Sequence, residues 1–172
     1  MELPGRNIIV GGDHNYPPFE YLDNEGNPAG YNVDMIHAIA REMGLNVEIR
    51  LGPWTQITTM LEHGEIDLIQ GMTYSAERDK FFDFSQAHTV HQHVAIARQS
   101  GDGGRIPGSE AELRGKRIVV QAGDIMHEFA IERETTVSCH TSRRDLPSLN
   151  GRVSIARSTT SGWVYTLYPS TI

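Results

Sequence analysis

The first 70 residues alternate between strand patterns and helix patterns, and this alternation limits the fold more than any other feature. The strand patterns cover residues 8–10, 46–51 and 66–70. One helix pattern has Asn32 as its expected N-cap and Gly44 as its expected end, and the other covers residues 55–62. Strands joined through helices pair in parallel with right-handed crossovers. The sequence therefore predicts an α/β fold built on a parallel sheet.

The segment after the first strand, residues 11–31, has the composition of a stiffened binding loop. Two glycines allow a sharp turn and a close approach to the backbone, and two prolines fix the chain direction. Asp13 supplies a carboxylate, and Tyr16 and Phe19 supply aromatic faces. Open α/β sheets bind ligands at the carboxyl ends of their strands. From these residues alone, a binding loop and a well-packed turn with both aromatic rings in the core remain equal alternatives.

The loop after the third strand should lie beside the first loop. Gly71 offers an accessible backbone, Thr73 a hydroxyl group, and Arg78 a planar guanidinium suited to a carboxylate. An isolated arginine of this kind is more often a solvated surface residue. The convergence of several loops on one edge of the sheet favours a binding role instead.

The second half of the chain begins a further strand–loop–helix unit. A β-rich run over residues 89–97 and a polar linker over 100–108 precede a strand at 116–120. Asp124 should cap a helix over Ile125–Glu132, whose exposed amides would favour an anion. The expected division is a first lobe over residues 1–90, the start of a second lobe over 91–133, and an atypical tail over 134–172.

Composition excludes several classes of protein. A formal charge of −7 disfavours nucleic acid and anionic membranes as partners. No apolar run approaches the ~20 residues of a membrane span, and the first residues lack the pattern of a signal peptide. The expectation is therefore a cytoplasmic protein, or an extracytoplasmic one whose export or anchor segment is left off. The single cysteine, Cys139, rules out an internal disulfide.

Catalytic and metal-binding patterns are weak. His88, His91 and His93 lie close together, but no acid or cysteine is placed to complete a zinc site, so packing is the better interpretation. His127–Glu128 lacks the second histidine of a zinc-protease helix, and no serine stands in a nucleophile elbow. No metal, cofactor or catalytic residue is predicted.

Five motifs in register resemble the bacterial extracellular solute-binding proteins of family 3. They are G-x-D-x-x-Y-P-P-F-E-Y, G-Y-N-V-D-M, I-D-L-I-x-G-M-T, E-R and F-D-F-S, and the likeness covers roughly residues 8–132. The resemblance implies a two-lobed periplasmic-binding-protein type II fold that closes on a small polar solute such as an amino acid. The same module serves ABC-type uptake with a membrane permease, and it is the sensor input of histidine kinases and diguanylate cyclases. It also implies a periplasmic or other extracytoplasmic location.

The resemblance further implies a role for each matching residue. A ligand ammonium would pair with Asp13, the α-carboxylate would pair with Arg78, and the second lobe would complete the cage. The implied ligand-binding residues are Asp13, Tyr16, Trp54, Gly71, Thr73, Arg78, Gln121, Asp124 and Ile125. A shorter loop before Arg78, and His88 where transport members commonly carry tyrosine, favour the sensor branch.

Residues 134–172 depart from the family pattern. They are rich in Ser, Thr and Arg and show little periodicity, which leaves the second lobe incomplete in sequence. The two explanations are a change of reading frame near Glu134 and a divergent or disordered tail. Two other functions stay open, a dehydratase of the same fold and a non-functional truncated fragment.

Overall fold

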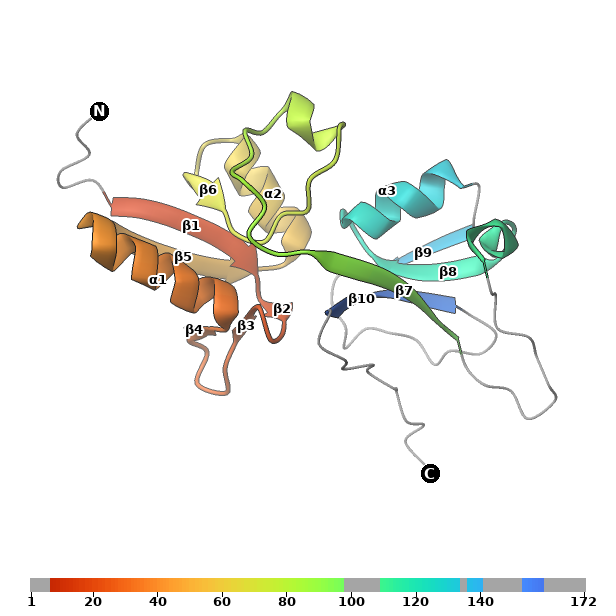
Figure 1. The fold of residues 1–172 in the computed structure, drawn as a ribbon, viewed down its shortest axis with the longest axis horizontal. Helices are drawn as coiled ribbons and strands as arrows, with labels where there is room; N and C mark the ends of the chain where they lie inside the picture. The colour runs from red at the N-terminus through yellow and green to blue at the C-terminus, as the bar shows by residue number, and fades with distance from the viewer. Residues whose placement is uncertain (1–6, 98–108, 134–135, 141–152, 160–172) are drawn as a thin grey trace.

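The computed structural model describes residues 7–97, 109–133, 136–140 and 153–159, and these residues form two lobes. Each lobe is built on its own sheet, and strand β7 (His91–Ala97) leads from the first lobe into the second (Figure 1). Both lobes combine strands with helices. The predicted two-lobed α/β architecture is confirmed.

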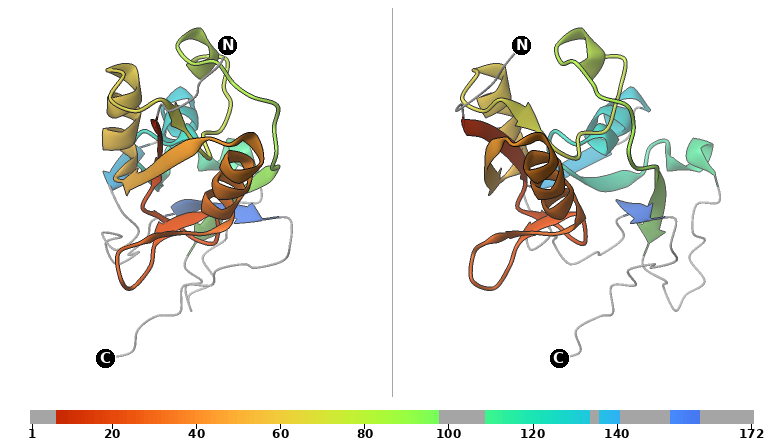
Figure 2. Two further views of the ribbon diagram at one scale, coloured as in Figure 1. Left: turned by 90° about the vertical axis from the view of Figure 1, so that its left-hand side faces the viewer. Right: turned by 60° about the vertical axis from the view of Figure 1, so that its left-hand side comes forward.

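The first lobe contains the parallel sheet that the sequence predicts. Its strands are β1 (Asn7–Asp13), β5 (Asn46–Gly52) and β6 (Leu68–Ile69), in the order β5-β1-β6. Helix α1 (Tyr31–Met43) connects β4 to β5, and α2 (Trp54–Glu62) connects β5 to β6. The two crossovers run in opposite directions along the sheet, so right-handed connections place α1 and α2 on opposite faces (Figure 2). The third strand is shorter than the predicted 66–70.

The segment after β1 folds into a second, small antiparallel sheet. Its strands are β2 (Asn15–Tyr16), β3 (Glu20–Leu22) and β4 (Pro28–Ala29). The turn between β3 and β4 is closed by the Asp23 side chain, which accepts from the amides of Glu25 and Asn27. The composition of residues 23–28, with Asp, Asn, Gly and Pro, is typical of such a hairpin turn.

Gly11 and Gly12 do not form the turn that the sequence suggests; both lie within β1 and pair with β5. A Cβ atom on Gly11 would lie 2.4 Å from Cδ1 of Ile66 and 2.8 Å from Cγ2 of Ile57. A Cβ on Gly12 would lie 2.9 Å from Leu51. The expected close approach is therefore present, and it allows α2 and its flanking residues to pack directly on the strand.

Helix α1 begins two residues earlier than the sequence predicts. Gly30, and not Asn32, occupies the N-cap position, with φ at 115°. Asn32 is instead buried, and its Nδ2 donates to Oε2 of Glu20 at 2.9 Å. Gly44 ends the helix in the left-handed conformation, as predicted, and Asp34 lies in the first turn.

The second lobe is a four-stranded mixed sheet in the order β7-β10-β8-β9. Strands β8 (Arg117–Gln121) and β9 (Thr136–His140) are parallel, whereas β10 (Val153–Thr159) is antiparallel to β7. Helix α3 (Ile125–Glu132) follows β8 and packs on the sheet. The 3₁₀ helices are η1 (Arg78–Lys80) in the first lobe and η2 (Glu110–Leu113) in the second.

The apolar core of the second lobe lies between α3 and β8. Burial of these side chains supplies the main stabilisation of the lobe. Its buried members are Leu113, Ile118, Val120, Met126 and Ala130, with Ile125 and Phe129 packed against them.

Strands β9 and β10 both come from the segment in which the sequence shows little periodicity. They contribute two of the four strands of the second sheet. The other residues between 134 and 172 lie outside the described residues. The hypothesis of a changed reading frame near Glu134 stays a prediction, which the coding DNA would test.

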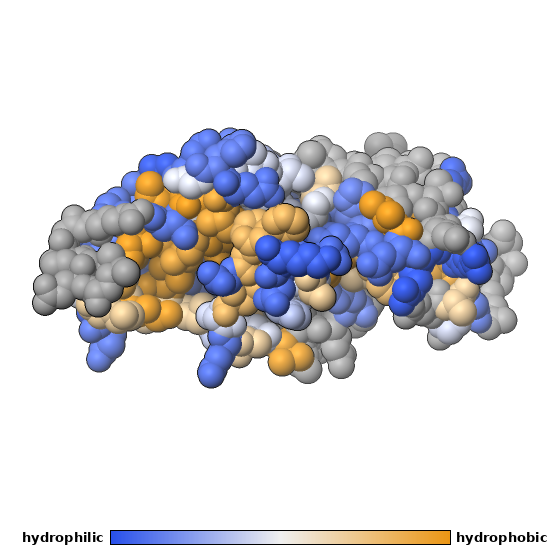
Figure 3. All heavy atoms as spheres, turned by 90° about the horizontal axis from the view of Figure 1, so that it is seen from above, coloured by the Kyte–Doolittle hydropathy of each residue, from blue (hydrophilic) through white to orange (hydrophobic). Residues whose placement is uncertain are grey.

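Apolar surface gathers over the first lobe, on the left of the view in Figure 3. Phe81 and Val90 are the most exposed of its described large apolar side chains, at 78% and 74%. Within the part of the chain that the structure describes, no helix has the length and apolar character needed to cross a membrane.

Candidate functional site

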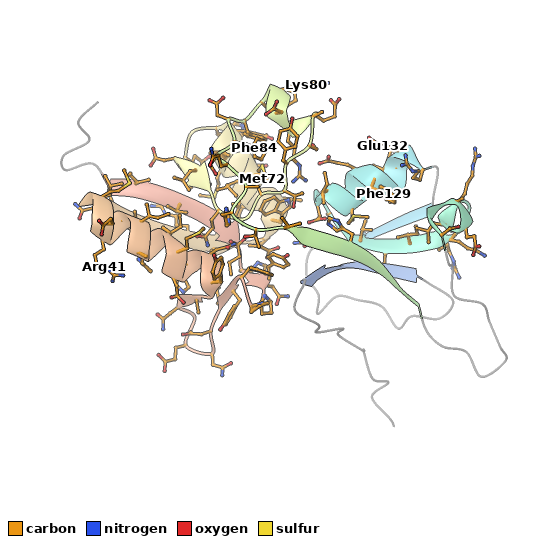
Figure 4. The ribbon with its side chains drawn as sticks, viewed as in Figure 1. Arg41, Met72, Lys80, Phe84, Phe129 and Glu132 are labelled. Atoms are coloured by element: carbon orange, nitrogen blue, oxygen red, sulfur yellow. The ribbon has the colours of Figure 1, made fainter. Side chains whose placement is uncertain are left out.

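The two lobes contact each other through residues at the carboxyl ends of their strands. Asp13 ends β1, Trp54 follows β5, and Arg78 follows β6 after a short loop. Their partners in the second lobe all lie between Gln121 and Glu128, at the end of β8 and the start of α3. Figure 4 labels Met72 on the loop after β6 and Phe129 on α3. The predicted convergence of these loops is present.

Asp13 and Gln121 form the first bridge between the lobes. Oδ2 of Asp13 accepts from Nε2 of Gln121 at 2.5 Å, and its Oδ1 accepts from the Asn15 amide at 2.8 Å. The Asp13 residue is only 6% exposed. A buried carboxylate with one oxygen facing a polar donor across an interface is suited to bind a cationic group.

Arg78 forms the second bridge, and all three nitrogens of its guanidinium donate hydrogen bonds. It is 7% exposed, and its Nε and Nη2 both lie 2.9 Å from Oε1 of Glu128. Nη1 donates to the Thr73 carbonyl at 3.1 Å, and Nη2 donates to the Gly123 carbonyl at 2.9 Å. The guanidinium is therefore held rigidly, with one carboxylate along its Nε–Nη2 edge.

The carbonyl of Gly123 receives two donors from the first lobe. Nε1 of Trp54 donates to it at 2.9 Å, beside the contact from Arg78. Trp54 is 6% exposed, so its ring is buried where the lobes meet. Buried indole N–H groups usually have a partner, and here the partner belongs to the other lobe.

Three further predicted residues, Tyr16, Gly71 and Thr73, belong to the first lobe. Tyr16 stacks on Phe19 with ring centroids 5.1 Å apart. The Thr73 hydroxyl is buried and has no hydrogen-bond partner among the described residues. Gly71 has φ at 77°, and a Cβ there would lie 2.8 Å from Nδ2 of Asn32.

The two remaining predicted residues act in the second lobe itself. Asp124 caps α3, because its Oδ1 accepts from the Met126 amide at 2.9 Å, as predicted. The Ile125 side chain packs against the second-lobe core.

A buried acid lies directly behind Asp13. Oε1 of Glu20 accepts from the Asp13 amide at 2.9 Å, and Oε2 accepts from Asn32 at the same distance. Glu20 is 1% exposed. Burial raises the pKa of Glu20 to about 7, and the hydrogen bonds from Asn32 and Asp13 only partly oppose this effect.

Sequence reasoning missed Glu128, the Gly123 carbonyl and the buried position of Glu20. One signal was available for Glu20, because an acid between Phe19 and Tyr21 in a short apolar strand is unusual unless it is bonded. Glu128 lies one helical turn after Asp124, but its partner in the other lobe is 50 residues away in the chain. No local pattern reports such a contact.

The described residues contain no group of three or more His, Cys, Asp or Glu side chains that could hold a metal ion. The side chain of His91, one of the three histidines considered above, lies outside the described residues.

Comparison with known proteins identifies one family. Residues 8–157 match the bacterial extracellular solute-binding proteins, family 3. The arginine-binding extracellular protein ArtP of Bacillus subtilis is 32% identical over 124 residues, which are 72% of this chain and 47% of that protein. The L-cystine-binding protein TcyJ of Escherichia coli K12 is 28% identical over 123 residues, or 71% and 46% of the two chains.

Solved structures give the same result. A histidine kinase sensor domain with similarity to periplasmic binding proteins has a TM-score of 0.81 at 35% identity, over 89% of this chain and 68% of that one. An arginine-bound ArgBP variant from T. maritima has a TM-score of 0.76 at 27% identity, over 88% and 73%. The chain thus spans about half the length of the curated relatives it matches.

Proposed function

The chain belongs to the bacterial extracellular solute-binding proteins, family 3, and we propose that it reversibly binds a small zwitterion, an amino acid, between its two lobes. In this proposal Arg78 takes the α-carboxylate and Asp13 takes the ammonium group. Closure of the lobes on the ligand is the output.

The observation that carries the proposal is the environment of Arg78. Its guanidinium is buried at the junction of the lobes, and its Nε–Nη2 edge contacts the carboxylate of Glu128. Both nitrogens of that edge approach one oxygen, Oε1, and the same edge can hold a carboxylate at two points. The edge is therefore positioned and desolvated for an anion of that shape.

The buried carboxylate of Asp13 supports a zwitterion, and not a simple anion, as the ligand. Asp13 is buried in the same junction and presents Oδ2 toward the second lobe. A ligand with separated positive and negative groups would pair with both side chains, whereas the second negative charge of a dianion would be repelled by the carboxylate of Asp13.

The relatives support an amino acid as the class of ligand, since ArtP is arginine-binding and TcyJ is L-cystine-binding. The likeness to a kinase sensor domain supports a sensory role, and the transport relatives support delivery to a permease. In either role the domain would work outside the cytoplasm, in contact with a permease or with a fused kinase or cyclase output.

A thermal-shift screen of the 172-residue chain against the twenty amino acids tests the proposal. Binding raises the melting temperature by mass action, so a shift at millimolar ligand is expected for at least one amino acid. Recovery of that amino acid unchanged after incubation separates binding from the dehydratase alternative. The absence of any shift would contradict binding by this chain.

Arg78→Ala provides the matched test of the head-group contact. We expect the shift to disappear, because a charge-assisted two-point contact is lost at a buried site. Arg78→Lys should recover only part of it, since an ammonium lacks the planar pair of donors. A loss of only a few-fold in affinity with Arg78→Ala would contradict the assigned role.

A further inference from the structure

The carboxylate-binding edge of Arg78 is already occupied by this chain. Nε and Nη2 of Arg78 both lie 2.9 Å from Oε1 of Glu128. Oε2 of Glu128 in turn accepts from the Ser75 hydroxyl at 3.4 Å. The Glu128 carboxylate is therefore held by the first lobe at both of its oxygens.

The remaining donors of Arg78 leave little room for another carboxylate. A guanidinium has five N–H groups. Nε donates to Oε1 of Glu128, and Nη2 forms an ion pair with the same oxygen. Nη1 donates to the Thr73 carbonyl and Nη2 to the Gly123 carbonyl. A carboxylate needs two adjacent donors for a two-point contact, so one of these three partners must leave before it can bind.

Glu128 is the partner that leaves at the lowest cost. The Thr73 and Gly123 oxygens belong to the backbone and move only with their loops. The Glu128 side chain is 37% exposed, whereas that of Arg78 is 8% exposed. Rotation about its side-chain bonds returns the Glu128 carboxylate to water, while Arg78 cannot become solvated without opening the lobes.

We propose that Glu128 is an internal competitor for Arg78: its carboxylate occupies the guanidinium in the absence of ligand, and an amino-acid carboxylate must displace it to bind. This inference rests on the proposed function. It makes Glu128 a determinant of affinity that opposes binding, although it lies within the site. Only ligands that carry a carboxylate meet this opposition, because only they compete for the same donors.

The test compares dissociation constants of the full chain with those of Glu128→Gln. Glutamine keeps the shape of the side chain and removes the charge that binds Arg78. Glu132→Gln is the matched control, since it removes one negative charge from the next turn of the same helix, at an exposed residue. The probes are the twenty amino acids and, for each that binds, the amine that lacks its carboxylate, such as agmatine for arginine. Circular dichroism verifies that each variant is folded.

We expect Glu128→Gln to bind the amino acid about tenfold more tightly, and Glu132→Gln to bind it like the unaltered chain. The decarboxylated amine should gain nothing from Glu128→Gln. Binding by Glu128→Gln where the unaltered chain shows none would support the inference equally.

Three results would overturn it. Unchanged binding would show that Glu128 does not compete, and weaker binding would show that it positions Arg78. An equal gain in affinity for the amine would show that the change in net charge, and not competition for Arg78, causes the effect. In each of these cases the unaltered chain still binds an amino acid, so the proposed function stands. If neither chain binds any amino acid, the proposed function falls and this inference falls with it.

Discussion

At the scale of single residues, the junction between the lobes depends on a buried polar group that does not itself bridge them. Glu20 accepts from the Asp13 amide and from Asn32, so it fixes both the backbone that carries Asp13 and the start of α1. Its burial without a cationic partner among its recorded bonds favours the protonated form. The charge state of Glu20 should therefore influence stability.

The pH dependence of stability follows from the sign of this shift. The pKa of Glu20 rises from 4.5 to about 7 on folding, so between these values the folded chain binds more protons than the unfolded chain. The free energy of unfolding should fall as pH rises through this window, by about 3 kcal/mol in total. Glu20→Gln should remove that part of the fall.

Urea unfolding at pH 5 and pH 8 measures the effect. Glu20→Gln should unfold at a higher urea concentration than the unaltered chain at pH 8, with a smaller difference at pH 5. Glu62→Gln, at an exposed residue of α2, controls for the loss of a negative charge. The same pH profile for Glu20→Gln and the unaltered chain would contradict the prediction.

Gly71 is a second position near the site at which a side chain should be poorly tolerated. Its φ of 77° is strained for residues with a side chain, and a Cβ would approach Asn32 at 2.8 Å and Glu20 at 3.1 Å. We expect Gly71→Ala to lower the free energy of unfolding by about 1–3 kcal/mol. Gly26→Ala is the control, because Gly26 has φ at 85° with nothing within 4 Å. An equal loss in both variants would mean that crowding around Glu20 contributes nothing.

At the scale of elements, α3 connects the fold of the second lobe to the junction. Its apolar face packs on β8 through Met126 and Ala130, Asp124 is its N-cap, and Glu128 lies in its first turn. Acids in the first turn interact favourably with the helix dipole. The same turn that stabilises the helix thus presents a carboxylate to Arg78.

Asp124→Ala should destabilise α3 by about 1 kcal/mol, because the Met126 amide loses its acceptor. Asp124→Asn should retain most of the stability, since asparagine also caps helices well. The midpoint of urea unfolding measures both variants. If alanine and asparagine had the same effect, the charge of Asp124 and not its cap would be responsible.

Sequence patterns predicted the elements well and their long-range contacts poorly. The parallel pairing of β1 with β5 and β6 and the α3 cap both depend on patterns among neighbouring residues in the chain. The need for glycine at position 12 has a long-range cause instead, because Leu51 and Gln70 lie where a Cβ atom would be. Asparagine is a common N-cap residue, but Asn32 is buried and its Nδ2 donates to Oε2 of Glu20 instead.

The candidate site shows the same difference between local features, which the sequence predicts, and long-range contacts, which it does not. Strand–loop–helix order places Asp13, Trp54 and Arg78 at one edge of the sheet, and the sequence was sufficient for that. The pairing of Arg78 with Glu128 depends on how closely the two lobes approach. That distance is set by the whole molecule and leaves no trace in local periodicity.

At the scale of the whole molecule, the bridges between the lobes differ in their relation to a ligand. The Glu128 bridge uses donors that an amino-acid carboxylate needs, whereas the bond from Trp54 to the Gly123 carbonyl uses none of them. A bridge that competes with the ligand opposes binding. A bridge that does not compete stabilises the closed form and should favour binding.

Trp54→Phe tests this distinction, because it removes the N–H donor and keeps an aromatic ring at the junction. One hydrogen bond contributes about 1 kcal/mol, so we expect the amino acid to bind roughly fivefold more weakly. The loss should occur mainly as faster dissociation, since the bond exists only when the lobes are closed. Stopped-flow kinetics and calorimetry measure the two quantities. Trp54→Ala, which also removes the ring, should weaken binding further. Unchanged affinity in Trp54→Phe would mean that this bridge does not contribute to closure, and a gain would mean that it competes with the ligand as Glu128 is proposed to do.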